Sequence, residues 1–427
     1  MNVKRPAAMH AIARRSGLIR AAVRLAPALA VLAAAAPAQG ESTEERAARV
    51  DSLAAIVARL RTPEAGMAAR AAAGPGGRNL TAFDRTAQRK LGGYYDVEFT
   101  AGDGIGSGFD LHRLILQASS FLGRRLFFNT EIEFEHGAVI PPEPSADEGE
   151  LKIEQAWGSI QLAEAASFRG GIILVPLGRL NVLHDSDIRD TTSRPLFTQV
   201  IVPSTFFETG VGVQGLAYPT EDWLLDYEVY VVNGLTDEVG DGAGLREARP
   251  SLRRDNNNSK ALTGRLGLSP SLHLETGVSV YSGATSAEIE DSRVSVVAFD
   301  ALWKQGPFEL MGEGGIVAIA DGLEAAGRPK GMNGFYVEGR YHFFPASWRG
   351  RLGLFDFDHP TFTLVGRAGT VDTDTGATTA GDRREILIGI NYRPIEQAVV
   401  KLEGVRYRET ATGTERDRLF ASIAMGF

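Results

Sequence analysis

One segment of the sequence, residues 181–205, gathers side chains that can bind ions. Its ionisable residues are His184, Asp185, Asp187, Arg189, Asp190 and Arg194. Imidazole and carboxylate groups bind divalent metals, and guanidinium groups hold anions through paired N–H donors. Carboxylates beside one histidine on a single loop are more often solvated or ion-paired than metal-bound. We therefore expect no metal here and interpret the segment as a charged loop that faces solutes.

The second half of the same loop is apolar. Its large apolar residues include Leu196, Phe197, Val200, Ile201 and Val202. A loop that extends into water gains nothing from such side chains, because they stabilise a fold only when they are buried. We expect the loop to fold inward and pack against a wall of the protein, with Arg189, Arg194 and the aspartates presented to solutes.

The elements that would position this loop are strands, because polarity alternates with a period of two from residue 91 onward. In one example the apolar face is Leu126, Phe128, Ile132 and Phe134, and the polar face is Asn129, Glu131, Glu133 and Glu135. A carboxylate is costly in hydrocarbon, so one face must meet water and the other an apolar medium. The pattern predicts an all-β fold, a transmembrane antiparallel barrel of about sixteen strands.

The strands are expected at 91–101, 108–120, 124–138, 151–163, 167–180, 206–218, 221–233, 258–268, 272–284, 292–304, 308–320, 331–344, 361–372, 383–393, 397–409 and 417–427. Short connections follow most even strands, and longer polar ones follow most odd strands, notably 139–150, 181–205 and 234–257. The long stretch 345–360 is an exception. Short turns at one end and long loops at the other are typical of outer-membrane barrels.

A barrel of this width leaves an aqueous channel. The basic residues expected to line it, as an anion-facing stripe, are Arg113, Arg125 and Arg169, together with Arg189 and Arg194 of the loop. With His184, Asp185 and Asp187 these form the predicted pore and constriction residues. Most charged wall residues are expected to pair with one another rather than with a solute. The channel would pass small ions or hydrophilic solutes.

Residues 1–38 have the pattern of an export signal. The segment carries six basic and no acidic residues, then the apolar run Leu25–Ala36 and a small-x-small site at Ala36-Pro37-Ala38. This apolar run is too short for a membrane anchor, so we expect the segment to be removed on export.

Residues 39–61 are predicted to form a short periplasmic coiled-coil helix, because Val50, Leu53, Val57 and Leu60 occupy a and d positions. Two heptads are unstable alone, so the helix indicates an oligomer, the alternative being a helix that lies on its own chain. Residues 62–90, rich in Gly and Pro near their middle, are expected to be a flexible linker. The barrel domain would then span 91–427.

Composition excludes several other classes of protein. The 427 residues contain no cysteine, which excludes disulfide scaffolds, thiolate metal sites and cysteine nucleophiles. The formal net charge of −8 gives no basic footprint for nucleic acid. Beyond the signal no apolar run reaches the length of a membrane helix. A Gram-negative outer membrane and its lipid are the expected surroundings.

The C-terminus supports the same prediction. Phe427 ends an alternating strand in which Leu419, Ala421, Ile423 and Met425 share one face. A terminal aromatic residue on such a strand resembles the signal read by the barrel assembly machinery of the outer membrane. That machinery is therefore an expected partner.

Two alternatives remain open. An outer-membrane enzyme, such as a lipid hydrolase, would need a nucleophile, a base and an orienting group, but none of the seven histidines lies near a G-x-S-x-G motif. A structural or adhesive barrel would favour a narrower barrel or large outer domains. We interpret the polar run from Asp255 to Asn258 as a turn rather than as a calcium site. We expect no enzymatic activity, no catalytic residues and no cofactor.

The stretch from Gly170 to Gly215 resembles the phosphate-selective porin O/P family. The resemblance is carried by Pro176-Leu-Gly178, His184, Arg194-Pro195, Ile201-Val-Pro203-Ser204 and Glu208-Thr-Gly210-Val-Gly212-Val-Gln-Gly215. It implies a homotrimeric sixteen-stranded pore with the third loop folded inward. Known members move anions such as phosphate with arrays of lysine and arginine. This sequence departs from that pattern, with 30 basic against 47 acidic residues from 91 onward and no lysine in 181–205, so only weak ion selectivity is expected.

Overall fold

The computed structural model describes most of the barrel domain. The described residues are 89–122, 125–137, 149–220, 223–240, 242–249, 255, 257–349, 353, 357, 359–377 and 381–427. The predicted signal (1–38), coiled-coil helix (39–61) and most of the predicted linker (62–90) lie outside them and stay predictions. In the described part of the chain, no helix has the length and apolarity needed to cross a membrane.

Sixteen strands make up the described part of the chain. They are β1 (Arg89–Gly102), β2 (Ile105–Phe121), β3 (Leu126–Glu135), β4 (Glu150–Ala163), β5 (Ala166–Leu174), β6 (Phe207–Ala217), β7 (Leu224–Val232), β8 (Ala261–Ser271), β9 (Leu274–Ala284), β10 (Arg293–Gln305), β11 (Phe308–Ile319), β12 (Gly331–Phe343), β13 (Thr361–Asp372), β14 (Arg383–Ile395), β15 (Ala398–Glu409) and β16 (Glu415–Gly426). The short helices are α4 (Leu196–Val200), α5 (Asp321–Ala325) and the 3₁₀ turn η1 (Ala346–Trp348).

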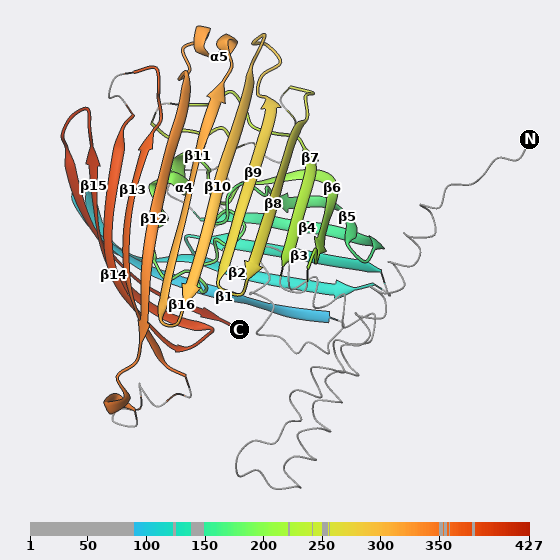
Figure 1. Ribbon diagram of the computed structural model, residues 1–427. Helices are drawn as coiled ribbons and strands as arrows, with labels where there is room; N and C mark the ends of the chain where they lie inside the picture. Colours follow the sequence, from blue (N-terminus) through green and yellow to red (C-terminus); the bar gives the residue numbers. More distant parts are fainter. Residues whose placement is uncertain are drawn as a thin grey trace, which may run out of the picture. The chain divides into compact units, whose positions relative to one another are not determined.

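Each strand pairs antiparallel with its neighbours in sequence, and β1 pairs with β16, so the sheet closes into a barrel (Figure 1). The last residue completes the seam. Phe427 N–H donates to Gly93 O at 2.9 Å, and Gly93 N–H donates to Phe427 O at 3.2 Å. Closure leaves no unpaired strand edge, which is the condition for strands to cross a bilayer.

Burial alternates along the strands as their polarity does. In β14, Glu385, Leu387 and Asn391 point inward and are each 1% exposed, whereas Ile386 and Ile388 point outward and are 60% and 73% exposed. The outer face is therefore apolar and the inner face polar. The predicted all-β barrel of sixteen strands and its two-faced pattern are confirmed.

The fifth strand differs from its predicted bounds. It ends at Leu174, so residues 175–180 belong to the following loop instead of to the strand. Pro176 has no N–H to donate to a ladder, and Gly178 has a φ of 72°, in the left-handed region that favours glycine. A Cβ on Gly178 would lie 2.5 Å from Glu313 Oε2, so the chain turns inward at a position where only glycine fits.

Aromatic rings gather at the short-turn end of β12 to β14. Phe362 lies 4.7 Å from Tyr392 and 5.7 Å from Phe343, between ring centroids, and Tyr341 stacks on Phe343 at 5.7 Å. Amphipathic rings prefer the boundary between membrane and water. This cluster is consistent with one of the two interfaces expected for a membrane barrel.

Candidate functional site

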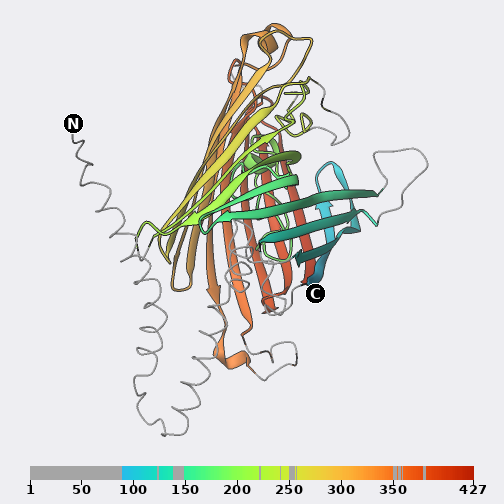
Figure 2. The same ribbon diagram turned by 90° about the vertical axis from the view of Figure 1, so that its right-hand side faces the viewer.

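Residues 175–206, here called the inner loop, connect β5 to β6 and lie within the ring of strands (Figure 2). The side chain of Asn181 fixes the base of the loop. Its Nδ2 donates to Val175 O at 2.7 Å and to Phe206 O at 3.0 Å, and its Oδ1 accepts from Phe206 N–H at 2.8 Å. One buried amide thus ties the two ends of the loop together.

The apolar half of the inner loop is buried. Phe197 and Ile201 are fully buried, and Leu196 and Val200 nearly so, in one cluster with inward residues of the wall. The ring of Phe197 lies 6.5 Å from that of Tyr336 in β12. Burying a side chain of this size contributes about 1.5–3 kcal/mol. The apolar half of the loop, which includes α4, therefore packs against the barrel wall, as the sequence predicts.

Inward carboxylates of the wall bind backbone N–H groups of the inner loop. Glu403 of β15 accepts from Thr192 N–H at 2.9 Å and from Ser193 N–H at 2.6 Å. Glu313 of β11 accepts from the N–H groups of Arg179 and Leu180 at 2.8 and 2.9 Å. Charge-assisted bonds of this kind are the stronger ones. These two inward glutamates therefore help to hold the loop.

Inward cations bind the carbonyl groups of the same loop. Arg393 of β14 donates to Asp187 O at 2.6 Å and to Ile188 O and Arg189 O at 3.0 Å each. Lys401 of β15 donates to Ser186 O at 2.6 Å. The wall thus supplies acceptors for the N–H groups and donors for the C=O groups of a loop that lies outside helices and sheets.

The inner loop spans the lumen. His184 Nε2 lies 3.2 Å from Glu154 Oε2 on β4, and Asp190 pairs with Arg340 on β12 at 3.1 Å. Strands β4 and β12 are diametrically opposite in the ring of sixteen. A loop held at both places must narrow any passage through the barrel.

His184 and Asp185 are buried and have unusual proton affinities. Burial lowers the pKa of His184 to about 4, with Asp185 opposing the shift and Arg194 and Arg113 adding to it. Burial raises the pKa of Asp185 to about 6. The Nδ1–H of His184 donates to Asn181 O at 2.9 Å. Both ring nitrogens are thus engaged by the loop and the wall, an arrangement that packs the histidine rather than presenting it as a base.

The predicted arginines occupy different surroundings. Arg113 faces inward on β2 and pairs with Glu133 at 3.3 Å. Arg169 on β5 pairs with Glu228 at 3.5 Å and lies 3.9 Å from the centroid of the Trp157 ring. Arg125 is exposed in the short turn between β2 and β3, away from the inner loop.

The predicted loop residues mainly hold the loop itself. Arg189 is buried and donates to His184 O, Thr191 O and Thr192 O. Arg194 donates to Ser204 Oγ at 3.1 Å, and the pKa of its guanidinium is lowered to about 9 by burial and by Arg113 and Arg189. Asp185 accepts from Tyr94 OH at 3.3 Å. The Asp187 carboxylate lies near Gly426, the last residue of β16.

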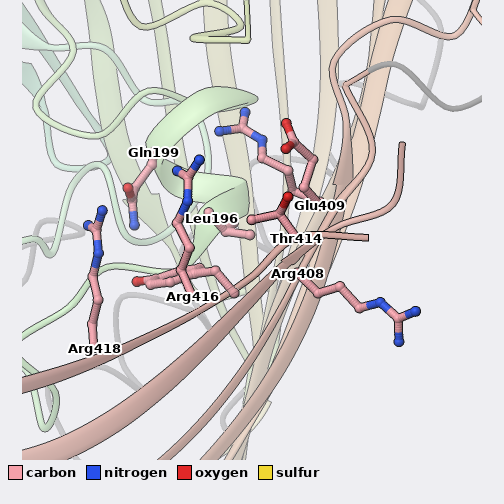
Figure 3. A pocket seen from close by; sticks show the side chains of 9 residues that line it. Leu196, Gln199, Arg408, Glu409, Thr414, Arg416 and Arg418 are labelled. Atoms are coloured by element: carbon pink, nitrogen blue, oxygen red, sulfur yellow. The ribbon is translucent and has the colours of Figure 1, made fainter. Parts of the chain in front are cut away.

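A second group of arginines, not among the predicted site residues, faces a cavity of about 170 Å³ beside α4. Its lining is Leu196, Gln199, Arg383, Tyr407, Arg408, Glu409, Thr414, Arg416 and Arg418. Figure 3 shows the guanidinium groups of Arg416 and Arg418 on the side of Gln199, with Arg408 directed away. Among the described residues neither Arg416 nor Arg418 forms an ion pair, although Arg418 lies 5.7 Å from the Tyr407 ring.

These arginines could have been found by assigning faces to the last strand. Arg416 pairs with Tyr407 and Arg418 with Val405 across β15 and β16, on the same inward face as Glu403. They lie at the end of the barrel that carries the long connections. The inner face therefore offers cations near this mouth, while several of its carboxylates are occupied by the inner loop.

The contacts of Asp190 predict how acid affects the inner loop. Burial opposes ionisation of this carboxyl, but Arg340 and Arg393 outweigh it and keep the pKa of Asp190 below its ordinary 3.8. A lowered pKa means that the stabilisation is present above about pH 4 and is lost as pH falls through the lowered value. His184 acts in the same direction, because its pKa is lowered from the ordinary 6.5 to about 4, so the held loop loses stability as pH falls between these two values. Asp185 acts in the opposite direction, because its raised pKa makes acid below about pH 6 favour the buried form.

The opposing effects of His184 and Asp185 offset each other between about pH 6 and 4, so we expect single-channel conductance to be steady from about pH 8 to 5 and to rise below about pH 4, as Asp190 is protonated and the loop loosens. Asp190→Asn should show the raised conductance already at neutral pH, since the amide keeps the shape of the side chain and removes its charge. Recordings on both proteins across this range check the prediction. A wild-type conductance that stays constant down to pH 3 would contradict it.

No family model matches the chain. An uncharacterised protein of Aquifex aeolicus (strain VF5) is 27% identical over 343 residues, which cover 74% of this chain and 75% of that relative. Among solved structures, OmpF of Salmonella typhi in complex with daunomycin aligns with a TM-score of 0.53 at 10% identity, over 79% of this chain and 97% of that one. The chain thus has the barrel fold of the outer-membrane porins.

Two further structures align less closely. The anion-selective porin from Comamonas acidovorans has a TM-score of 0.49 at 11% identity, over 79% of this chain and 99% of that chain. The outer membrane channel DcaP of Acinetobacter baumannii has a TM-score of 0.48 at 13% identity, over 79% and 97%. These likenesses concern the fold, and the resemblance of residues 170–215 to the phosphate-selective porins stays a prediction.

Proposed function

We propose that the protein is a passive diffusion channel of the Gram-negative outer membrane, which admits small hydrophilic solutes and ions past the inner loop. The observation that carries this proposal is that the inner loop crosses a closed barrel and is held on opposite walls by inward charged residues. A barrel of this width would be water-filled without the loop. The shared fold with outer-membrane porins supports the same function.

We further propose a modest preference for anions such as phosphate or chloride. The net charge argues for the opposite preference, but net charge does not report which groups a solute meets. Glu313, Glu385 and Glu403 accept hydrogen bonds from loop N–H groups, whereas Arg416 and Arg418 face the mouth without an ion pair among the described residues. A cation that lacks a nearby carboxylate attracts anions more strongly.

Planar bilayer recordings test both proposals. The folded chain should insert with stepwise increases in conductance, and a silent bilayer at high protein load would contradict the channel. In a KCl gradient the reversal potential should have the sign of a weakly anion-selective pore. The double variant Arg416→Gln/Arg418→Gln should shift that potential toward cation preference. The control Arg406→Gln, which removes an outward arginine paired with Asp417, should leave it unchanged, and an equal shift in both variants would contradict the proposed role of the mouth.

Two further proposals concern the assembly of the protein. The assembly would be a homotrimer whose periplasmic helices (residues 39–61) associate, and conductance steps would then come in multiples of three. The barrel assembly machinery would recognise β16 together with Phe427, whose side chain is 57% exposed. Chemical cross-linking in membranes gives the number of chains. Monomers under conditions that preserve the barrel would argue against the trimer.

A further inference from the structure

Three side chains with the ligand atoms of a metal site converge at one end of β2 and β3. His136 Nδ1 lies 2.7 Å from Asp110 Oδ2, and His112 Nδ1 lies 3.6 Å from the same oxygen. One ligand atom from each residue lies within 4.8 Å of the other two. The two imidazole rings meet edge to face, with centroids 5.4 Å apart. We propose that Asp110, His112 and His136 bind a divalent transition-metal ion such as Zn²⁺.

The distances suit the size of such an ion. Zinc binds imidazole nitrogen and carboxylate oxygen at about 2.0–2.2 Å, so neighbouring ligand atoms of a tetrahedral site lie about 3.4 Å apart. The separations of 2.7 and 3.6 Å lie on either side of that value. Small side-chain rotations would seat the ion, with no movement of the strands. Two imidazoles and one carboxylate are also a ligand set that suits zinc and its neighbours in the first transition row.

The backbone is shaped to bring the three residues together. A β-bulge shifts the register of β1 and β2, so that Asp96 pairs with Arg113 but Glu98 pairs with Asp110. Bulges re-aim side chains and recur near functional sites. His136 has a φ of 52°, unusual for a residue other than glycine. Its N–H donates to His112 O at 3.2 Å, which holds the two histidines side by side.

Nearby charges can adapt to a bound cation. Arg113 donates to His112 Nε2 at 2.9 Å, but it also pairs with Glu133 and Glu135. When the metal occupies Nδ1, the imidazole proton lies on Nε2, and Glu98 Oε1 is 4.0 Å from that nitrogen. A carboxylate behind a metal-bound histidine is a common supporting contact. The surrounding acids also offset the charge of the ion.

The site is open to solvent on the side of the long connections. The side chains of Asp110, His112 and His136 are 39%, 25% and 49% exposed. An ion can therefore enter, and a fourth coordination position remains for water or a solute group. None of the three ligand residues belongs to the inner loop, so the proposed metal site does not depend on how the channel is constricted.

Cobalt titration of the full-length protein tests the proposal. Detergent-folded chain without a histidine tag is stripped with EDTA, Co²⁺ is added, and the visible absorption of coordinated cobalt is followed, with Zn²⁺ as competitor. We expect one Co²⁺ per chain, displaced by Zn²⁺. His136→Asn should weaken binding by at least about 10-fold, and it preserves the turn because asparagine tolerates a positive φ. Asp110→Asn is a second ligand variant in case the first does not fold.

The control is His273→Asn, which removes an exposed histidine in the turn between β8 and β9. It should bind Co²⁺ as the wild type does. Gel mobility of heated and unheated samples confirms that each barrel is folded. A wild-type protein without a cobalt spectrum, or equal affinity in wild type and His136→Asn, would show that Asp110 and His136 form an ion pair only and would overturn the proposal.

Discussion

Deleting residues 185–199 and joining the ends with two glycines should raise the single-channel conductance several-fold. The deleted segment contains the contacts with β12 to β15 and all but the last residue of α4. The barrel should persist, because its strands are paired all around the ring without the loop. The wall charges that the loop now occupies would become hydrated. Conductance in planar bilayers at fixed salt is the measurement.

A deletion at the same end of the barrel gives the matched control. Removing α5 (Asp321–Ala325) shortens the connection between β11 and β12, which has no part in the inner-loop contacts described above. The conductance of this variant should stay near that of the wild type. Equal conductance in the wild type and the 185–199 deletion would show that the inner loop does not limit the passage.

Arg393→Ala should give the second largest effect, a channel with strong current fluctuations and a raised mean conductance. Its guanidinium contacts three loop carbonyl oxygens and the Asp190 carboxylate at 2.6 to 3.3 Å. Hydrogen bonds from a charged donor contribute about 1.5–3 kcal/mol each, but they are not additive and this side chain is partly exposed. We therefore expect the held state of the loop to lose about 2 kcal/mol relative to released states.

Two comparisons locate the cause. Arg393→Lys should be intermediate, because an ammonium group cannot present the planar fork that reaches several carbonyls at once. Arg406→Ala removes an exposed outward arginine paired with Asp417 and should record as the wild type does. A steady current through Arg393→Ala channels, or current fluctuations of the same size in Arg406→Ala, would refute the proposal that Arg393 anchors the inner loop.

The barrel itself could be predicted because strand pairing depends on local alternation. Each strand shows its two faces within about ten residues, and the predicted set differs from the observed one mainly at the ends. The end of β5 was the largest error. Residues 175–180 (VPLGRL) are apolar apart from Gly178 and Arg179, so their hydrophobicity continues that of the strand, whereas Pro176 and Gly178 mark its end.

The constriction could be predicted only in outline. The charged and apolar halves of 181–205 identify the segment, but many of its partners on the wall lie more than 100 residues away in the sequence. Glu403 beside Thr192, or Arg393 beside Ile188, follows from ring closure and register, which a single sequence does not specify. For the same reason the predicted role of Arg189 as a solute contact differs from its observed place, where it binds three carbonyls of its own loop.

The histidine and aspartate cluster had no sequence signal of its own. Asp110 and His112 are two residues apart on a strand, and in a regular strand they would only share a face. His136 lies in the turn directly after β3, and the bulge in β2 helps to bring all three residues together. Irregular backbone of this kind is where reasoning from periodicity fails.

Cysteine accessibility tests the central claim most directly, because the chain has no cysteine of its own. Ile188→Cys places a thiol on the inner loop, and Leu402→Cys places one on the outer face of β15, where Leu402 is 49% exposed. A charged, membrane-impermeant thiol reagent should lower the current through Ile188→Cys channels and leave Leu402→Cys channels unchanged. Unchanged current after complete labelling of residue 188, or block at residue 402, would contradict a water-filled passage narrowed by the inner loop.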